Sequence, residues 1–233
     1  MSLAQNLAAV HERIARAAKA AGRSPEDVHL MAVSKTVSAE RIVEAYEAGQ
    51  RLFGENRVQE FAEKHEAVRT LHGAEFHMIG HLQSNKAARA AELFQGVDSL
   101  DSAKLGDRLN AAAQKLRRAI EVLIEVNIGG ELAKSGIPAE SQELADILNA
   151  AASWANVKVA GLMTVPPFTE DPEGARPCFR KLRELRDRLA ARWPSVNLNV
   201  LSMGMSHDFE VAIEEGSTCL RIGAAIFGER PKP

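Results

Sequence analysis

One lysine stands where its amine could act as a nucleophile. Lys35 directly follows the apolar run His29 to Ser34, which predicts a buried strand. A lysine at the end of such a strand can point into a partly desolvated cavity, where burial lowers the pKa of the amine and frees it to condense with a carbonyl. A solvated or ion-paired lysine is the alternative interpretation.

The segment from Leu201 to Glu210 is suited to binding an anion. It runs from an apolar stretch through Gly204, with Ser202 and Ser206 on either side, into an expected helix. The N–H groups at the start of a helix point at a bound anion and the helix dipole favours its charge. The alternative is a purely structural turn in which Ser206 is the N-cap of the helix.

A second segment, Arg221 to Ala225, ends the last apolar run. Gly223 lets a phosphate approach the backbone N–H groups closely, and Ala224 follows it. Arg221 is a planar donor that carries its charge at every physiological pH, so it could hold a phosphate or lie against an aromatic ring nitrogen. A glycine required only for packing and an arginine paired with a carboxylate are the alternatives.

Weaker candidates follow other apolar runs. Asn56 could orient a ligand or cap the next helix. His77 and His81 flank the end of the third run, but their spacing is not the helical pair that zinc sites favour, so we expect no metal site. Three more polar residues are typical of solvated loops: Asp98, Ser99 and Lys134.

The elements that must position these residues alternate between short apolar runs and longer stretches of helical period. Eight runs are expected as strands: His29 to Ser34, Arg51 to Gly54, Glu75 to Ile79, Gly96 to Leu100, Ile120 to Val126, Val157 to Met163, Asn197 to Ser202 and Thr218 to Ile222. The helical stretches between them include Ala39 to Ala48, Asp101 to Lys115, Pro138 to Ala152 and Gly174 to Arg192.

Eight alternating units predict a single α/β domain over residues 1–233, a (β/α)8 TIM barrel with an extra N-terminal helix. An open doubly wound sheet is the alternative. Phosphate sites of TIM barrels frequently use the loops after strands 7 and 8, which is where the two glycine-containing segments lie.

Composition excludes several classes of function. The 29 Lys and Arg residues against 31 Asp and Glu give a net charge of -2, and aromatic residues make up 5%. We therefore expect no nucleic-acid partner. Two cysteines, Cys178 and Cys219, are too few for a disulfide framework, which favours a reducing, cytoplasmic location.

The N-terminus predicts an amphipathic helix. Leu3, Leu7, Val10 and Ile14 share one helical face, and polar residues interrupt any signal-peptide core. No apolar run approaches the roughly 18 residues of a membrane span, so we expect no membrane association.

Together these segments resemble a known family. The chain is similar to the pyridoxal phosphate homeostasis proteins of the YggS type. The matching motifs are, in order, Ala32 to Thr36, Phe53 to Glu60, His77 to Lys86, Gly161 to Thr164, Leu201 to Ser206, Arg221 to Gly223 and Ile226 to Gly228.

The resemblance implies a barrel like the N-terminal domain of alanine racemase, of fold type III, with pyridoxal 5'-phosphate (PLP) carried on Lys35 as an internal aldimine. It also implies that Asn56 lies near this cofactor and that Arg221 faces its pyridine nitrogen. The residues that match the phosphate-binding segments are Ser202, Gly204, Ser206, Gly223 and Ala224. At Ala224 the family usually has Thr or Ser, so a hydroxyl is lost and we expect a weaker grip on the phosphate.

Carrier and enzyme are both compatible with such a site. An arginine against the ring nitrogen keeps that nitrogen unprotonated and weakens the ring as an electron sink. A racemase of this type also needs a tyrosine from a second, C-terminal domain, whereas this sequence ends at Pro233 and its single tyrosine, Tyr46, lies in an expected helix. We therefore expect a PLP-binding protein of PLP homeostasis, without catalytic residues.

Two enzymatic alternatives remain. One is a PLP-dependent racemase or lyase that uses His207 or Lys134 as a second base, and the other is a Schiff-base aldolase of a phosphorylated sugar. PLP is the expected partner, with PLP-dependent apoenzymes as recipients. A monomer is expected because the racemase-type second domain, with its dimer interface, is lacking.

Overall fold

Eight apolar runs form parallel strands that close into a barrel. The computed structural model describes residues 2–130 and 135–228. Each strand pairs with its neighbours in parallel, β1 pairs with both β2 and β9, and β4 pairs with β5, so the sheet closes on itself. The barrel strands are β1 (His29–Val33), β2 (Leu52–Glu55), β3 (Glu75–Met78), β4 (Gly96–Leu100), β5 (Ile120–Asn127), β7 (Val157–Met163), β8 (Val200–Ser202) and β9 (Cys219–Ile222). The prediction of a single TIM barrel is confirmed, and the open doubly wound sheet is wrong.

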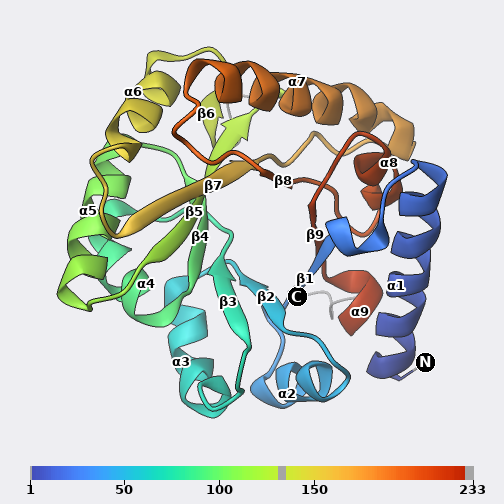
Figure 1. Ribbon diagram of the computed structural model, residues 1–233. Coiled ribbons are helices and arrows are strands. Elements are labelled where there is room, and N and C mark those ends of the chain that lie inside the picture. Colours follow the sequence, from blue (N-terminus) through green and yellow to red (C-terminus); the bar gives the residue numbers. More distant parts are fainter. Residues whose placement is uncertain (1, 131–134, 229–233) are drawn as a thin grey trace.

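Helices form the outer ring around these strands (Figure 1). They are α1 (Leu3–Ala20), α2 (Ala39–Glu47), α3 (Val58–Val68), α4 (Ala87–Leu93), α5 (Ala103–Lys115), α6 (Gln142–Ala151), α7 (Arg176–Arg192), α8 (Phe209–Glu214) and α9 (Ala224–Phe227). Short 3-10 helices occur at Pro25–Asp27, Ser84–Lys86 and Pro172–Ala175.

The region around Pro138 differs from the prediction. Pro138 opens no helix: Ile137–Pro138 forms a two-residue strand, β6, that pairs in parallel with the end of β5. Helix α6 begins only at Gln142, because the Ser141 hydroxyl accepts a hydrogen bond from the N–H of Leu144 (3.3 Å) and caps it. Proline is compatible with both the start of a helix and an edge strand, so its presence did not distinguish them.

Two further element boundaries differ from the prediction. The run Asn197 to Ser202 yields a strand only from Val200, because the Asn197 side chain accepts a hydrogen bond from the N–H of Asn199 (3.0 Å) and forms a local turn instead. The stretch Gly174 to Arg192 is split: a 3-10 turn occupies Pro172–Ala175, and α7 begins at Arg176.

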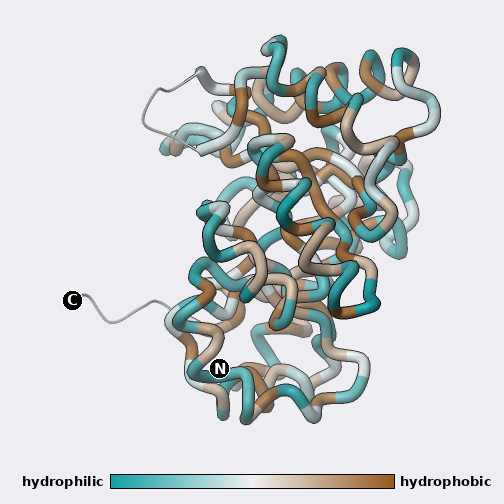
Figure 2. Tube along the Cα trace, turned by 90° about the vertical axis from the view of Figure 1, so that its left-hand side faces the viewer, coloured by the Kyte–Doolittle hydropathy of each residue, from teal (hydrophilic) through white to brown (hydrophobic). Residues whose placement is uncertain are grey.

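The core lies between the barrel and the helices. Hydrophobic segments run through the interior of the molecule, and hydrophilic segments occupy its outer turns (Figure 2). On β5, alternate residues Val122, Ile124 and Val126 pack toward the helices, whereas Leu123 belongs to a small cluster inside the barrel. Because side chains alternate along a strand, Glu125 also faces the barrel interior.

The predicted N-terminal helix is confirmed as α1, with Leu3, Leu7, Val10 and Ile14 buried. It packs beside α8 and α9 in the outer ring (Figure 1). Within the described ranges, no helix is long and apolar enough to cross a membrane.

Candidate functional site

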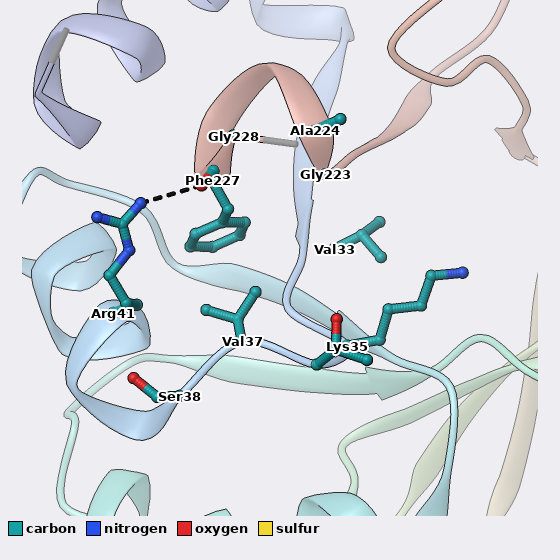
Figure 3. Close-up of a pocket in the computed structure, with 10 residues that line it drawn as sticks. Val33, Lys35, Val37, Ser38, Arg41, Gly223, Ala224, Phe227 and Gly228 are labelled. Carbon is teal, nitrogen blue, oxygen red and sulfur yellow. Dashed lines mark hydrogen bonds between the residues drawn. The ribbon is translucent and has the colours of Figure 1, made fainter. Parts of the chain in front are cut away.

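Lys35 lies just beyond the end of β1, where the chain turns toward α2. It lines a cavity of about 190 Å³ at this end of the barrel, and its amine points away from Arg41 and Phe227 (Figure 3). The next residue, Thr36, has a left-handed backbone conformation with φ 62°. The lysine singled out from the sequence therefore occupies the predicted kind of position, at the carboxyl end of a barrel strand.

Gly223 and Ala224 line the same cavity as Lys35 (Figure 3). A Cβ atom at Gly223 would lie 3.3 Å from the carbonyl oxygen of Val33, so β9 ends in close contact with the end of β1. Helix α9 starts here, and the first N–H groups of a helix have no intrahelical acceptor. The structure thus brings the Lys35 side chain and the first turn of α9 to one opening.

Arg221 lies inside the barrel below this opening. Its side chain donates hydrogen bonds to the Ser202 hydroxyl (2.7 Å) and to the Thr164 carbonyl oxygen (2.7 Å), and only 4% of the residue is exposed. Burial lowers the pKa of the guanidinium. The described residues include no carboxylate in a salt bridge with Arg221, so it is not the simple ion pair considered as an alternative.

The Ser202 hydroxyl is therefore engaged with Arg221 and wholly buried. Its match to a phosphate-binding segment stays a prediction. The contact seen here gives this hydroxyl a different role, because it helps to fix the arginine.

Two buried carboxyl groups share the barrel interior with Arg221. Glu125 on β5 and Asp98 on β4 each have one oxygen, Oε2 and Oδ2, that finds no hydrogen-bond partner among the described residues. Burial raises the pKa of Glu125 to about 7, against the opposing charge of Arg221. The remaining Asp98 oxygen pairs with His77 Nδ1 at 2.9 Å.

Glu125 is the site residue that sequence reasoning missed. The signal was present as a charged residue within the apolar run Ile120 to Val126. A charge is costly at a buried strand position unless it is paired or neutralised, and the position is therefore a functional-site candidate.

The segment after β8 forms a tight turn into α8. Gly204 has φ 97°, and a Cβ atom there would lie 2.6 Å from Cβ of Ala212. The N-cap of α8 is Asp208, whose carboxylate accepts a hydrogen bond from the N–H of Met205 (2.7 Å), so the interpretation of Ser206 as N-cap is wrong. Ser206 remains a partly exposed hydroxyl in the turn.

Arginines of α7 hold α8 in place from outside. Glu215, at the C-terminal end of α8, forms salt bridges with Arg176 (3.2 Å), Arg180 (2.9 Å) and Arg183 (3.0 Å). The glutamate side chain is 5% exposed. These contacts fix the helix that follows the Gly204 turn.

Asn56 lies elsewhere. The N-cap of α3 is Arg57, so Asn56 is not the cap. It lines a separate cavity of about 230 Å³ together with Arg57, His81 and Lys86. A place near a cofactor on Lys35 stays a prediction for Asn56.

The remaining candidates have structural partners. His81 pairs with Asp101 (3.1 Å), and the Ser99 hydroxyl donates to the Gly80 carbonyl oxygen (2.6 Å). Lys134 lies outside the described residues. In the part of the chain that the structure describes, no three His, Cys, Asp or Glu residues are grouped to hold a metal ion.

Of the two candidate second bases, only His207 lies within the described residues, and neither it nor the single tyrosine, Tyr46, lines the Lys35 cavity. The Tyr46 hydroxyl donates to the carbonyl oxygen of His72 (2.9 Å) on the outer surface. The His207 ring is exposed, and its Nε2 lies 3.1 Å from the carbonyl oxygens of Thr169 and Glu170.

Comparison with known proteins places this geometry in a family. The pyridoxal phosphate homeostasis protein of Aquifex aeolicus (strain VF5) is 48% identical over 230 residues, which cover 99% of each chain. The chain belongs to the pyridoxal phosphate homeostasis protein family. The family member of Escherichia coli (strain K12) is 41% identical over 98% of this chain and 97% of its own.

The chain also matches a broader domain family. The alanine racemase N-terminal domain family matches residues 5–231. Among solved structures, the family member PipY of Synechococcus elongatus PCC7942 with PLP bound superposes with a TM-score of 0.82 at 34% identity, covering 97% of this chain and 100% of PipY. Alanine racemase of Clostridium difficile 630 shares the fold, with a TM-score of 0.71 at 14% identity over 99% of this chain and 57% of the racemase.

Proposed function

We propose that this protein binds PLP through Lys35 and serves PLP homeostasis, without catalytic turnover of amino acids. The observation that carries the proposal is the cavity that gathers Lys35 with Gly223 and Ala224 at the carboxyl end of the barrel. The bound PLP of the PipY structure supports it.

The residues present fit this cofactor. Gly223 approaches the end of β1 without a side chain, which leaves room and backbone donors for a phosphate. Arg221 is held by Ser202 and Thr164 at the base of the opening, and a guanidinium there would face a ring nitrogen. When bound, PLP supplies an aldehyde, which condenses with a primary amine with loss of water.

Each residue of the proposed site would then have its own role in binding. Lys35 would provide the amine, Gly223, Ala224 and the turn of Gly204 and Ser206 would hold the phosphate, and Arg221 would disfavour protonation of the ring nitrogen. A ligand held in this way would stay reactive toward amines but would be a poor electron sink, which favours storage and release over racemisation.

The positions of Tyr46 and His207 also favour a carrier. Each side chain contacts backbone carbonyl oxygens, and neither lines the Lys35 cavity, which argues against a role as a second acid or base. We further propose that residues 1–233 act as one PLP-binding domain and a monomer that passes PLP to apoenzymes.

The test is absorption spectroscopy of the purified protein with PLP, before and after borohydride, followed by peptide mass mapping. We expect a reduced adduct on Lys35 in the wild type and none on that peptide in Lys35→Ala. Lys35→Ala should keep its fold, because the residue lies beyond the packed strand. Absence of any adduct on Lys35, or release of a racemised amino acid by the loaded protein, would refute the proposal.

A further inference from the structure

A largely buried ionic cluster lies on the outer side of the strands, beside the loop that carries Lys35; its most exposed member is Glu60, whose side chain is 27% exposed. Lys64 reaches from α3 to two carboxylates: its ammonium is 2.9 Å from Glu55 Oε1 and 3.0 Å from Glu60 Oε1. The Lys64 side chain is 12% exposed and that of Glu55 is fully buried. None of the three lines the cavity that contains Lys35, so the proposed cofactor site does not account for them.

The same ammonium also binds the backbone of the loop that carries Lys35. Lys64 Nζ donates to the carbonyl oxygens of Ser34 (3.1 Å) and Val37 (3.2 Å). These two residues stand on either side of the Lys35–Thr36 pair. One cation thus contacts both ends of a four-residue turn.

The two carboxylates accept hydrogen bonds from the same turn. Glu55 Oε1 accepts a hydrogen bond from the Ser34 hydroxyl (2.7 Å), and Glu60 Oε1 accepts one from the N–H of Thr36 (2.5 Å). Both neighbours of Lys35 in sequence are therefore fixed by side chains that Lys64 also contacts.

The turn needs such support because of its backbone. Thr36 has φ 62°, a conformation that β-branched residues rarely adopt and that persists only where the surroundings enforce it. If the contacts were lost, the turn would relax toward an ordinary conformation and the direction of the Lys35 side chain would change with it.

The two side chains at this strand end point to opposite sides. Ser34 points outward to the cluster, and successive side chains of an extended segment point to opposite faces, so Lys35 is directed to the barrel opening. Burial raises the pKa of Glu55 while the charge of Lys64 acts to lower it. Without Lys64 the buried Glu55 carboxylate would lose its compensating charge.

We propose that Lys64, with Glu60, is a positioning residue that holds the Ser34–Val37 turn so that the Lys35 amine is presented to the cavity. The inference rests on the proposed binding of PLP through Lys35. It adds that the rate of covalent attachment is set from outside the cavity, by residues that never touch the ligand.

The test compares the rate of covalent attachment with non-covalent affinity. The first is the rate at which PLP becomes borohydride-reducible on Lys35. The second is the affinity for pyridoxine 5'-phosphate, which has an alcohol in place of the aldehyde and cannot react with the amine. Lys64→Met should slow attachment about tenfold, or about 1.4 kcal/mol of activation free energy, and change the affinity for the alcohol less than about twofold. Lys115→Met, the same substitution on an exposed face of α5, should match the wild type in both.

A second, less disruptive pair of variants keeps the test decisive if Lys64→Met does not fold. Glu60→Ala removes the acceptor of the Thr36 N–H but leaves the buried Glu55–Lys64 pair intact, whereas Glu63→Ala changes a residue of the same helix that lies outside the cluster. We expect Glu60→Ala to slow attachment and Glu63→Ala to leave it unchanged. Wild-type attachment rates in a folded Lys64→Met and in Glu60→Ala would overturn the proposal, and so would an equal loss of both readouts. If the wild type itself forms no adduct on Lys35, the proposed function fails instead.

Discussion

The carboxyl group of Glu125 makes a quantitative prediction about stability and pH. Burial in the barrel raises its pKa from 4.5 to about 7. At about 1.4 kcal/mol per pKa unit, the ionised form is less favourable in the folded protein than in the unfolded chain by about 3 kcal/mol. Glu125→Gln replaces the carboxyl with a neutral group of the same size.

The direction follows from which state binds the proton more tightly. The folded protein retains the Glu125 proton up to about pH 7, whereas the unfolded chain loses it near pH 4.5. The contribution of this group to the free energy of unfolding is therefore highest below about pH 4.5 and falls as the pH rises to about 7, beyond which it is constant. The free energy of unfolding of Glu125→Gln, relative to that of the wild type, should therefore rise by up to about 3 kcal/mol between about pH 4.5 and about pH 8.

Urea unfolding followed by circular dichroism, without added PLP, measures this difference. Glu121→Gln is the matched control, because Glu121 lies on the same strand but is exposed, and its difference from the wild type should stay nearly flat. A flat difference for Glu125→Gln as well would show that the Glu125 carboxylate is ionised and well solvated in the folded protein. The reasoning about a buried, partly unpaired oxygen would then be wrong.

Two other substitutions test how the turn and helix beside the site are held. Gly204→Ala should lower the free energy of unfolding in urea by about 1–3 kcal/mol more than Gly228→Ala does. Both glycines have positive φ, but of the two only Gly204 has a neighbour, at 2.6 Å, that a Cβ atom would meet. Equal losses in the two variants would contradict this prediction. Glu215→Gln should lower the free energy of unfolding by about 1–2 kcal/mol at neutral pH. Hydrogen bonds from Arg180 and Arg176 outweigh burial and keep the pKa of Glu215 below its ordinary value. The wild type therefore loses this contribution as the pH falls and the carboxylate is protonated, so the difference between the two proteins should shrink in acid. Glu184→Gln changes a residue of α7 outside these salt bridges, and an equal loss of stability in the two variants at neutral pH would show that the salt bridges of Glu215 do not stabilise the fold.

The order of the strands and the place of Lys35 could be predicted from sequence because both depend on local pattern. Apolar runs of strand length separated by helical stretches report burial directly, and a residue that ends such a run must lie at one end of the barrel. The same reasoning failed at Pro138 and Asn197, where a single side-chain cap or a local turn decides the boundary.

Contacts between distant elements could not be predicted from sequence. Lys64 looks like an exposed residue of an amphipathic helix until the fold brings it within 3.1 Å of the Ser34 carbonyl, 30 positions earlier. Asn56 shows the reverse case: it follows a strand as expected, yet its cavity is distinct from that of Lys35. Hydrophobic periodicity predicts which face of a helix or strand is buried, but it does not predict which other element packs against that face.

The docking of α1 on the last helices has a consequence for biosynthesis. The Asn6 side chain donates to the carbonyl oxygen of Ile226, 220 positions away, and Arg13 pairs with Glu210 at 2.6 Å. The apolar face of α1 is translated before α8 and α9, and these helices cannot cover it until they have left the ribosome. During that interval the nascent chain exposes a hydrophobic stripe, a feature that invites chaperone binding and aggregation. Barrel closure by β1 and β9 faces the same delay, and the Lys35 cavity, which is lined from the ends of both strands, cannot be completed before β9 and α9 are available.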